Sequence, residues 1–183
     1  MLPNDIEQYQ VFNKQTYTPY KKQLNLLLND FSNSTDKLSK NYTLENIDID
    51  NLDDITLIVY KNNIVAFASV LSRSIWPKNT SRIFNRLLRN KRFEWKNPAF
   101  GIISKMVHDH QIAYCKSVKK DYVFISQETK KLWLRKWVQQ ANEYNSGWTI
   151  CDEKKKVTNG NSSGSIQHIA YKKISNTNQL FLL

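Results

Sequence analysis

The sequence has few cysteines and no long apolar run, and both shortages restrict the kind of protein it can be. Its two cysteines, Cys115 and Cys151, are too few for a disulfide framework and do not have the spacing of metal ligands. No uninterrupted apolar stretch approaches the roughly 20 residues that a membrane-spanning helix needs. We therefore expect a soluble, cytoplasmic protein with no membrane partner.

Several catalytic and targeting motifs are also missing. The chain has no nucleophile elbow, no P-loop and no Rossmann glycine pattern. Its first residues lack the basic start and apolar stretch of a signal peptide. His108 and His110 point about 200° away from each other on a helix, so they cannot share a metal ion. We expect no metal site, and we interpret His110 as a core histidine.

The length of 183 residues is enough for one hydrophobic core and short for two. We therefore expect a single domain over residues 1–183, in which residues 1–54 supply an N-terminal helix and a connection. No sequence motif marks that first part.

Positive charge is concentrated in the middle of the chain. Residues 72–120 carry 12 basic and 2 acidic side chains, a balance of +10 out of the net +11. Five of the six arginines lie there: Arg73, Arg82, Arg86, Arg89 and Arg92. Such a patch favours a nucleic acid or another polyanion as a partner, and the alternative is a solvated basic face.

Hydrophobic periodicity predicts an alternation of helices and strands. The predicted helices cover Pro19–Phe31, Pro98–Cys115 and Thr129–Tyr144, and the predicted strands include a hairpin around Asn62-Asn63, "SRIFNRLL" (81–88), "YVFIS" (122–126), "GWTICD" (147–152) and "SIQHIAYKKI" (165–174). The stretch "EKKKVTNGNSSG" (153–164) has the composition of a loop. The helix from Pro98 has one predicted apolar stripe, made of Ala99, Ile102, Ile103, Met106, His110, Ala113 and Tyr114.

This order predicts an α/β (α+β) fold. A strand–helix–strand unit entered from a hairpin gives a mixed, mainly antiparallel sheet with helices on both faces. The order resembles the GNAT acyltransferase superfamily over residues 55–173, with "SRIFNRLLRN" in the place of the central fourth strand.

The local motifs are similar to a divergent, phage-type branch that includes the Mom-like DNA-modification proteins. The segments that carry this likeness are Asn85-Arg86-Leu87, Lys96-Asn97, "QQANEY" (139–144) and Gly147. The resemblance implies a phage protein in the host cytoplasm that modifies DNA.

The resemblance also implies a cofactor site at the start of the helix that follows the fourth strand. A helix N-terminus attracts anions, and in GNAT enzymes it holds the pyrophosphate of acetyl-CoA. The implied cofactor-binding residues are Arg89, Arg92, Lys96, Asn97, Ala99, Phe100, Gly101 and Ile102. The alternative is that Asn97 only caps the helix and the basic side chains lie in solvent. Only Gly101 matches the family's glycines in "RFEWKNPAFG", so another acyl-CoA or a different acyl carrier is an alternative donor.

The same resemblance implies the catalytic residues. Tyr144 would be the proton donor, and its alternative role is a core aromatic. Ser126 and Asn85 would contact the substrates, and the alternative role of Ser126 is a cap at the end of a strand. Arg73, Arg82 and Arg86 would bind nucleic acid. Two functions are therefore open: an N-acyltransferase acting on a nucleic-acid amine, or a non-catalytic basic module that binds nucleic acid or an acidic protein.

Overall fold

The computed structural model describes residues 8–32, 49–71, 79–84, 99–127, 131–157 and 165–175. The chain divides into two compact units, one made of residues 1–70 and 84–111 and the other of residues 71–83 and 112–183. Helix α3 (Ala99–Ser117) gives its longer, N-terminal part to the first unit and its last residues to the second.

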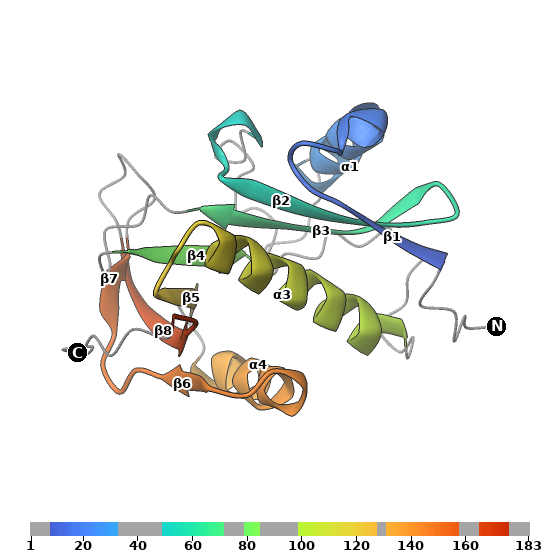
Figure 1. Ribbon diagram of the computed structural model, residues 1–183. Coiled ribbons are helices and arrows are strands. Elements are labelled where there is room, and N and C mark those ends of the chain that lie inside the picture. The colour runs from blue at the N-terminus through green and yellow to red at the C-terminus, as the bar shows by residue number, and fades with distance from the viewer. Residues whose placement is uncertain are drawn as a thin grey trace. The chain divides into compact units, whose positions relative to one another are not determined.

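The described strands of the first unit form an antiparallel sheet with a helix on each face (Figure 1). Its elements are β1 (Tyr9–Phe12), η2 (Thr18–Tyr20), α1 (Lys21–Ser32), η4 (Ile49–Asn51), β2 (Asp54–Tyr60) and β3 (Asn63–Leu71). Strand β2 is central and pairs with both β1 and β3.

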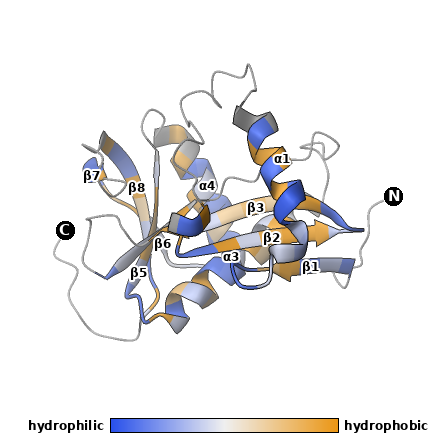
Figure 2. Cartoon of the chain, turned by 90° about the horizontal axis from the view of Figure 1, so that it is seen from above, coloured by the Kyte–Doolittle hydropathy of each residue, from blue (hydrophilic) through white to orange (hydrophobic). Residues whose placement is uncertain are grey.

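Side-chain alternation along β2 explains why both faces are covered. Ile55 and Leu57 pack in one core cluster with Leu24 of α1, whereas Ile58 packs in another with Ile103 of α3. Successive strand residues point to opposite faces, so a continuous apolar run such as that of β2 must be covered twice. Figure 2 shows hydrophobic and hydrophilic residues interleaved along α1, as expected for a helix with one buried face.

Strand β3 carries one residue more than its partner strand. Ile58 pairs with Ala66 and the next residue, Val59, pairs with Ile64, so Val65 is the extra residue of a β-bulge. Val65 and Ala66 both belong to the core cluster on the α3 side, while Ile64 belongs to that on the α1 side.

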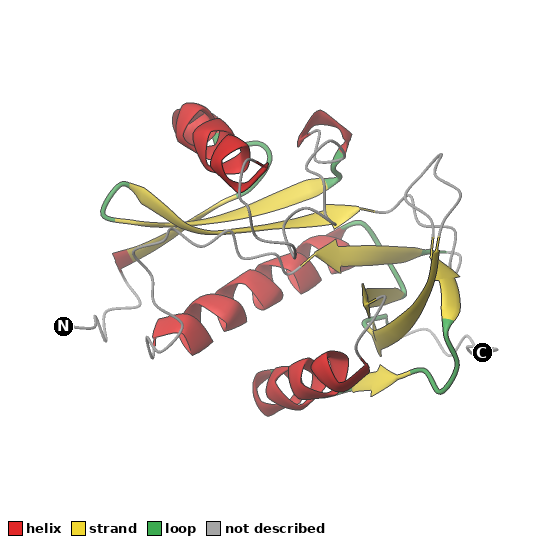
Figure 3. Ribbon diagram, turned by 180° about the vertical axis from the view of Figure 1, so that it is seen from behind, coloured by secondary structure: helices red, strands yellow, loops and turns green. Residues whose placement is uncertain are grey.

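The second unit contains a mixed sheet and one further helix, α4 (Lys131–Tyr144), which lies between β5 and β6 in the chain. Its strands are β4 (Thr80–Phe84), β5 (Tyr122–Gln127), β6 (Trp148–Ile150), β7 (Lys155–Val157) and β8 (Ser165–Lys173). Strand β5 runs parallel to β4 and antiparallel to β8, and β8 also pairs with β6 and β7. Helix α4 leads directly into β6 (Figure 3) and packs against β5, β6 and β8.

These elements confirm the predicted fold class. Within each of the two units, the strand pairs are antiparallel except for β4 and β5, which are parallel and connected through α3. The three predicted helices are present as α1, α3 and α4. None of the helices within the described ranges is long and apolar enough to cross a membrane. The single-domain expectation stays a prediction.

Four details of the sequence-based prediction were wrong. Strand β1 was not predicted, and β7 forms within the segment predicted as a loop. The hairpin turns one residue early, because positive φ falls on Lys61 and Asn62. On α3, Ile103 of the predicted stripe is buried, but Ala113 is exposed and His110 is only half-buried, because the buried positions also include Val107, His108, Gln111 and Cys115.

Candidate functional site

The pairing between β4 and β5 ends before either strand does. Among the described residues, the parallel register joins Thr80 to Tyr122, Ser81 to Val123 and Arg82 to Phe124, and no further pair follows. Strand β5 continues to Gln127 and keeps its other neighbour, because its last residues still pair with β8. Within the described part of the second unit, the last residues of β5 are therefore paired on the β8 side only.

Ser126 lies on this last stretch of β5. Its Oγ is buried, and among the described residues it has no hydrogen-bond partner. A buried hydroxyl without a partner is costly, about 1–3 kcal/mol, and Tyr9 Oη and Thr80 Oγ1 share this state with Ser126. Ser126 differs from them in its position at the end of β5. A hydroxyl at this point can donate a hydrogen bond to a ligand oxygen or accept one from a ligand amide.

Tyr144 is the last residue of α4 and is half-buried. The turn that follows it, Asn145–Gly147, is held by Lys172 of β8: its Nζ lies 2.6 Å from Asn145 Oδ1 and also donates to the Ser146 carbonyl. Burial and the charge of Lys116 lower the pKa of Lys172.

Asn142 fixes the same turn from inside the helix. Its Nδ2 donates to the Trp148 carbonyl at 3.1 Å, and its Oδ1 accepts the Trp148 N–H at 2.9 Å. Gly147 adopts φ 101°, a conformation that side chains disfavour. The segment "QQANEY" with Gly147, which carried part of the Mom-like resemblance, thus contains the residues that build the α4–β6 junction.

The other predicted site residues are divided between the described and undescribed parts of the chain. Ala99, Phe100, Gly101 and Ile102 form the first turn of α3, in the first unit. A Cβ at Gly101 would meet no atom of the described residues within 4 Å, so none of those residues requires glycine there. Arg82 lies on β4. Outside the described residues lie Arg73, Asn85, Arg86, Arg89, Arg92, Lys96 and Asn97.

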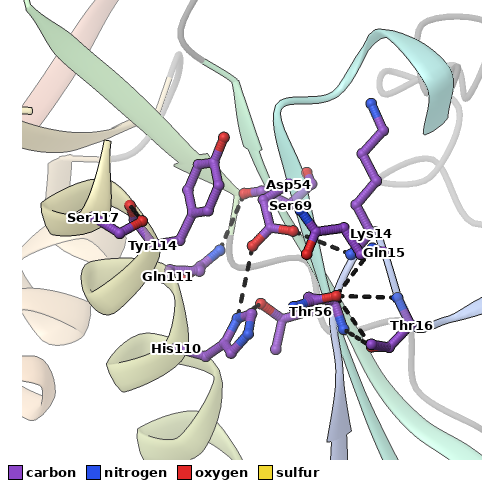
Figure 4. A network of polar contacts seen from close by, with 11 residues as sticks. Lys14, Gln15, Thr16, Asp54, Thr56, Ser69, His110, Gln111, Tyr114 and Ser117 are labelled. Carbon is purple, nitrogen blue, oxygen red and sulfur yellow. Dashed lines mark hydrogen bonds and ion pairs between the residues drawn. The ribbon is translucent and has the colours of Figure 1, made fainter. Parts of the chain in front are cut away.

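Sequence reasoning missed a polar cluster in the first unit (Figure 4). His110 Nδ1 lies 2.8 Å from Thr56 Oγ1 and 4.0 Å from Asp54 Oδ2. Asp54 Oδ1 also accepts the Lys14 N–H at 3.1 Å, and the Gln111 amide donates to the Ser69 carbonyl. Burial raises the pKa of Asp54 and lowers that of His110.

This cluster contains the residue types of a hydrolytic triad but not its geometry. A triad needs the nucleophile and the acid on opposite nitrogens of the imidazole ring, whereas Thr56 and Asp54 both approach Nδ1. We interpret the cluster as structural, because it ties α3 and the turn at Lys14 to the start of β2. Within the described ranges, no group of three potential metal-binding side chains is present.

Comparison with solved structures identifies the fold. The chain is similar to a GNAT-family acetyltransferase from Staphylococcus aureus Mu50 (17% identity, TM-score 0.57), which it matches over 91% of its own length and 99% of the other chain. It is similar to an acetyltransferase from Streptococcus agalactiae (11%, TM-score 0.57, 92% and 99%). It also matches N-acetylglutamate synthase from Neisseria gonorrhoeae complexed with coenzyme A and N-acetyl-glutamate (11%, TM-score 0.52), over 91% of this chain and 35% of that one.

No protein-family model matches the chain, and no curated protein matches it in sequence. At identities this low, the similarity establishes the fold alone. The chain therefore has the GNAT fold.

Proposed function

We propose that the protein is an N-acyltransferase that moves an acyl group from a coenzyme A thioester to an amine. The observation that carries the proposal is the end of β4–β5 pairing, where the Ser126 hydroxyl is buried and lacks a partner among the described residues. The GNAT fold supports it, and one structural neighbour is a complex with coenzyme A.

The chemistry asks the protein for proton management and positioning. Acyl transfer forms an amide bond and breaks a thioester, so one proton must leave the amine and one must reach the leaving sulfur. An acyl-CoA would supply the activated acyl group. Tyr144 would donate the second proton from its Oη, since the phenol of tyrosine, with a pKa near 10, is protonated at neutral pH.

The pyrophosphate of the donor would bind at the first turn of α3. The N–H groups of Ala99 to Ile102 begin this helix, and the partial positive charge of a helix N-terminus favours an anion. The open surroundings of Gly101 are compatible with such an approach. Arg89, Arg92, Lys96 and Asn97 would add charge and hydrogen bonds, and this part of the proposal rests on the sequence.

We propose a nucleic-acid amine as the acceptor. The net charge of +11, of which residues 72–120 hold +10, supports a polyanionic substrate. The resemblance of "QQANEY", Gly147, Asn85-Arg86-Leu87 and Lys96-Asn97 to motifs of Mom-like proteins supports a role in phage DNA modification. Because an amine on a base inside a duplex is inaccessible, the substrate would be single-stranded or the base would be flipped out.

The decisive variant is Tyr144→Phe. Loss of a general acid lowers kcat by about 10²–10⁴-fold, while the affinity for acetyl-CoA should stay unchanged. The readouts are acetyl transfer to an amine-bearing oligonucleotide and the thermal shift produced by acetyl-CoA. The matched control is Tyr20→Phe in the first unit, which should retain full activity.

A non-catalytic basic module would behave differently. In that case no acyl-CoA raises the melting temperature, and Tyr144→Phe changes nothing that can be measured. For a true ligand, a concentration of a hundred times its Kd stabilises by roughly 2.7 kcal/mol, which is easily detected. Absence of any shift with acetyl-CoA and longer acyl-CoAs would contradict the enzymatic proposal.

A further inference from the structure

Five lysines gather where α3 and β8 end in the second unit. Lys116 lies in the last turn of α3, Lys119 and Lys120 lie in the turn that leads to β5, and Lys172 and Lys173 are the last two residues of β8. We call these five residues the lysine cluster. Lys116, Lys119 and Lys120 end the basic stretch 72–120, and none of the five is among the residues to which the sequence assigned a nucleic-acid contact.

Backbone hydrogen bonds hold the lysine cluster together. The Lys120 N–H donates to the Cys115 carbonyl at 2.9 Å, and the Ile174 N–H donates to the Asp121 carbonyl at 2.8 Å. The second of these bonds places the end of β8 beside the turn. Strand register agrees, since Tyr122 pairs with Lys173.

A side-chain amide strengthens the same turn. Asn79 Nδ2 donates to the Lys119 carbonyl at 3.0 Å and to Asp121 Oδ2 at 2.6 Å. Lys119 itself adopts φ 57°, a left-handed conformation that marks a specific turn geometry. The lysines are therefore presented from a defined backbone.

The positive charge of the lysine cluster is largely uncompensated. Lys116, Lys119 and Lys173 are exposed, and none of the ion pairs found among the described residues involves a member of the cluster. Asp121 is the one acidic residue between Lys116 and Tyr122, so five lysines and one aspartate leave a local charge of +4. Like charges at short range repel each other, so bringing these lysines together lowers the stability of the folded protein.

We propose that the lysine cluster binds the phosphate backbone of a nucleic-acid strand. Regularly spaced phosphates match several exposed ammonium groups on adjoining elements, and releasing the counterions of those phosphates drives binding. The role of the lysine cluster rests on the proposed function, because the cluster would hold the nucleic acid whose amine is acylated. Binding itself requires no acyl donor.

The test is the quadruple variant Lys116→Gln, Lys119→Gln, Lys120→Gln and Lys173→Gln. Lys172 is left intact because it holds the α4–β6 turn. Fluorescence anisotropy would follow a labelled 20-nucleotide single strand, and a duplex of the same sequence, over a range of salt concentrations. The matched control removes four exposed lysines elsewhere: Lys21, Lys22, Lys136 and Lys154.

We expect the cluster variant to bind the single strand on the order of a hundredfold more weakly at 0.1 M salt, with a salt slope lower by roughly 0.7 per lysine. The control variant should change much less, although its net charge is the same. Weakening with the duplex alone would assign the surface to double-stranded nucleic acid. Circular dichroism and melting curves would establish that both variants are folded.

Three results would overturn the inference. One is equal weakening in the cluster and control variants, which would mean that net charge alone matters. Another is no binding to either oligonucleotide by the intact protein, and the third is equal displacement of the oligonucleotide by poly-glutamate, which would indicate an acidic protein partner. Tyr144→Phe should leave binding intact, so failure of acyl transfer and failure of this surface are distinguishable.

Discussion

At the scale of single residues, Asn142 and Ser126 differ in whether their polar side-chain atoms form hydrogen bonds within the described protein. Asn142 makes two hydrogen bonds to the Trp148 backbone, so its role in the structure is fully accounted for. The Ser126 hydroxyl is buried and makes no hydrogen bond to any described residue. Residues kept at a cost to stability are more often functional than residues that stabilise.

This contrast gives a prediction for Ser126→Ala. Removing a buried hydroxyl that lacks a partner should raise the stability of the ligand-free protein, by about 1 kcal/mol. The same change should reduce the thermal shift caused by acetyl-CoA. Denaturant unfolding with and without acetyl-CoA measures both effects, and Ser117→Ala, which removes an exposed hydroxyl bonded to the Tyr114 carbonyl, is the control. A destabilised variant with an unchanged ligand shift would contradict the proposed role.

Ser126 and Tyr144 could be named as candidate site residues from the sequence only because the order of the predicted helices and strands resembles that of the GNAT superfamily. Sequence reasoning could not reach Asp54 or Thr56, because their partner His110 lies 54 positions from Thr56 along the chain. A polar residue at the start of an apolar strand was the only available signal. Contacts over such separations depend on how a helix is rotated against a sheet, which periodicity alone gives only approximately.

At the scale of elements, the junction between α4 and β6 is the best-defined connection near the candidate site. The Asn142 side chain donates a hydrogen bond to the Trp148 carbonyl, and the Lys172 ammonium donates one to the Asn145 side chain. Trp137 packs edge-on against Trp148. Because Tyr144 ends the helix, the junction determines where its hydroxyl lies.

We expect Asn142→Ala to destabilise the protein by about 1–3 kcal/mol, because it removes both hydrogen bonds to Trp148. It should also lower acyl-transfer activity by displacing Tyr144. Gln139→Ala, an exposed change on the same helix, should alter stability by no more than about 0.5 kcal/mol. Urea unfolding gives the comparison, and equal stabilities for the two variants would show that the junction does not depend on Asn142.

The elements that could be predicted are the ones with strong periodicity. Helices α1, α3 and α4 and strands β2, β3, β5 and β8 are long enough to show a pattern. Strand β1 is four residues long and β7 three, and each exists because a partner strand lies beside it. Such short strands derive their stability from tertiary pairing, which a local pattern does not contain.

At the scale of the whole molecule, buried titratable groups couple stability to pH. The pKa of His110 is lowered from 6.5, so below pH 6.5 the unfolded chain binds a proton that the folded protein does not. Stability should therefore fall as the pH falls through that value. Asp54 has the opposite sign: its pKa is raised from 3.8, so its contribution falls as the pH rises above 3.8.

Replacing His110 by Gln isolates the first effect. Between pH 7.5 and 5.5 the parent protein should lose more unfolding free energy than the variant, by up to about 1.4 kcal/mol per pH unit. Urea titrations at several pH values provide the measurement. Parallel curves for the two proteins would show that His110 takes up no extra proton on unfolding.

The bulge in β3 has a consequence for how the length of this chain can change. Ile64 and Phe67 face α1 while Ala66 and Ala68 face α3, so without Val65 these four side chains already alternate regularly. Loss of a residue elsewhere in β3 would shift part of the strand by one and exchange its two faces. Val65 thus marks the position where an insertion or deletion could be absorbed during evolution while both hydrophobic layers keep their residues.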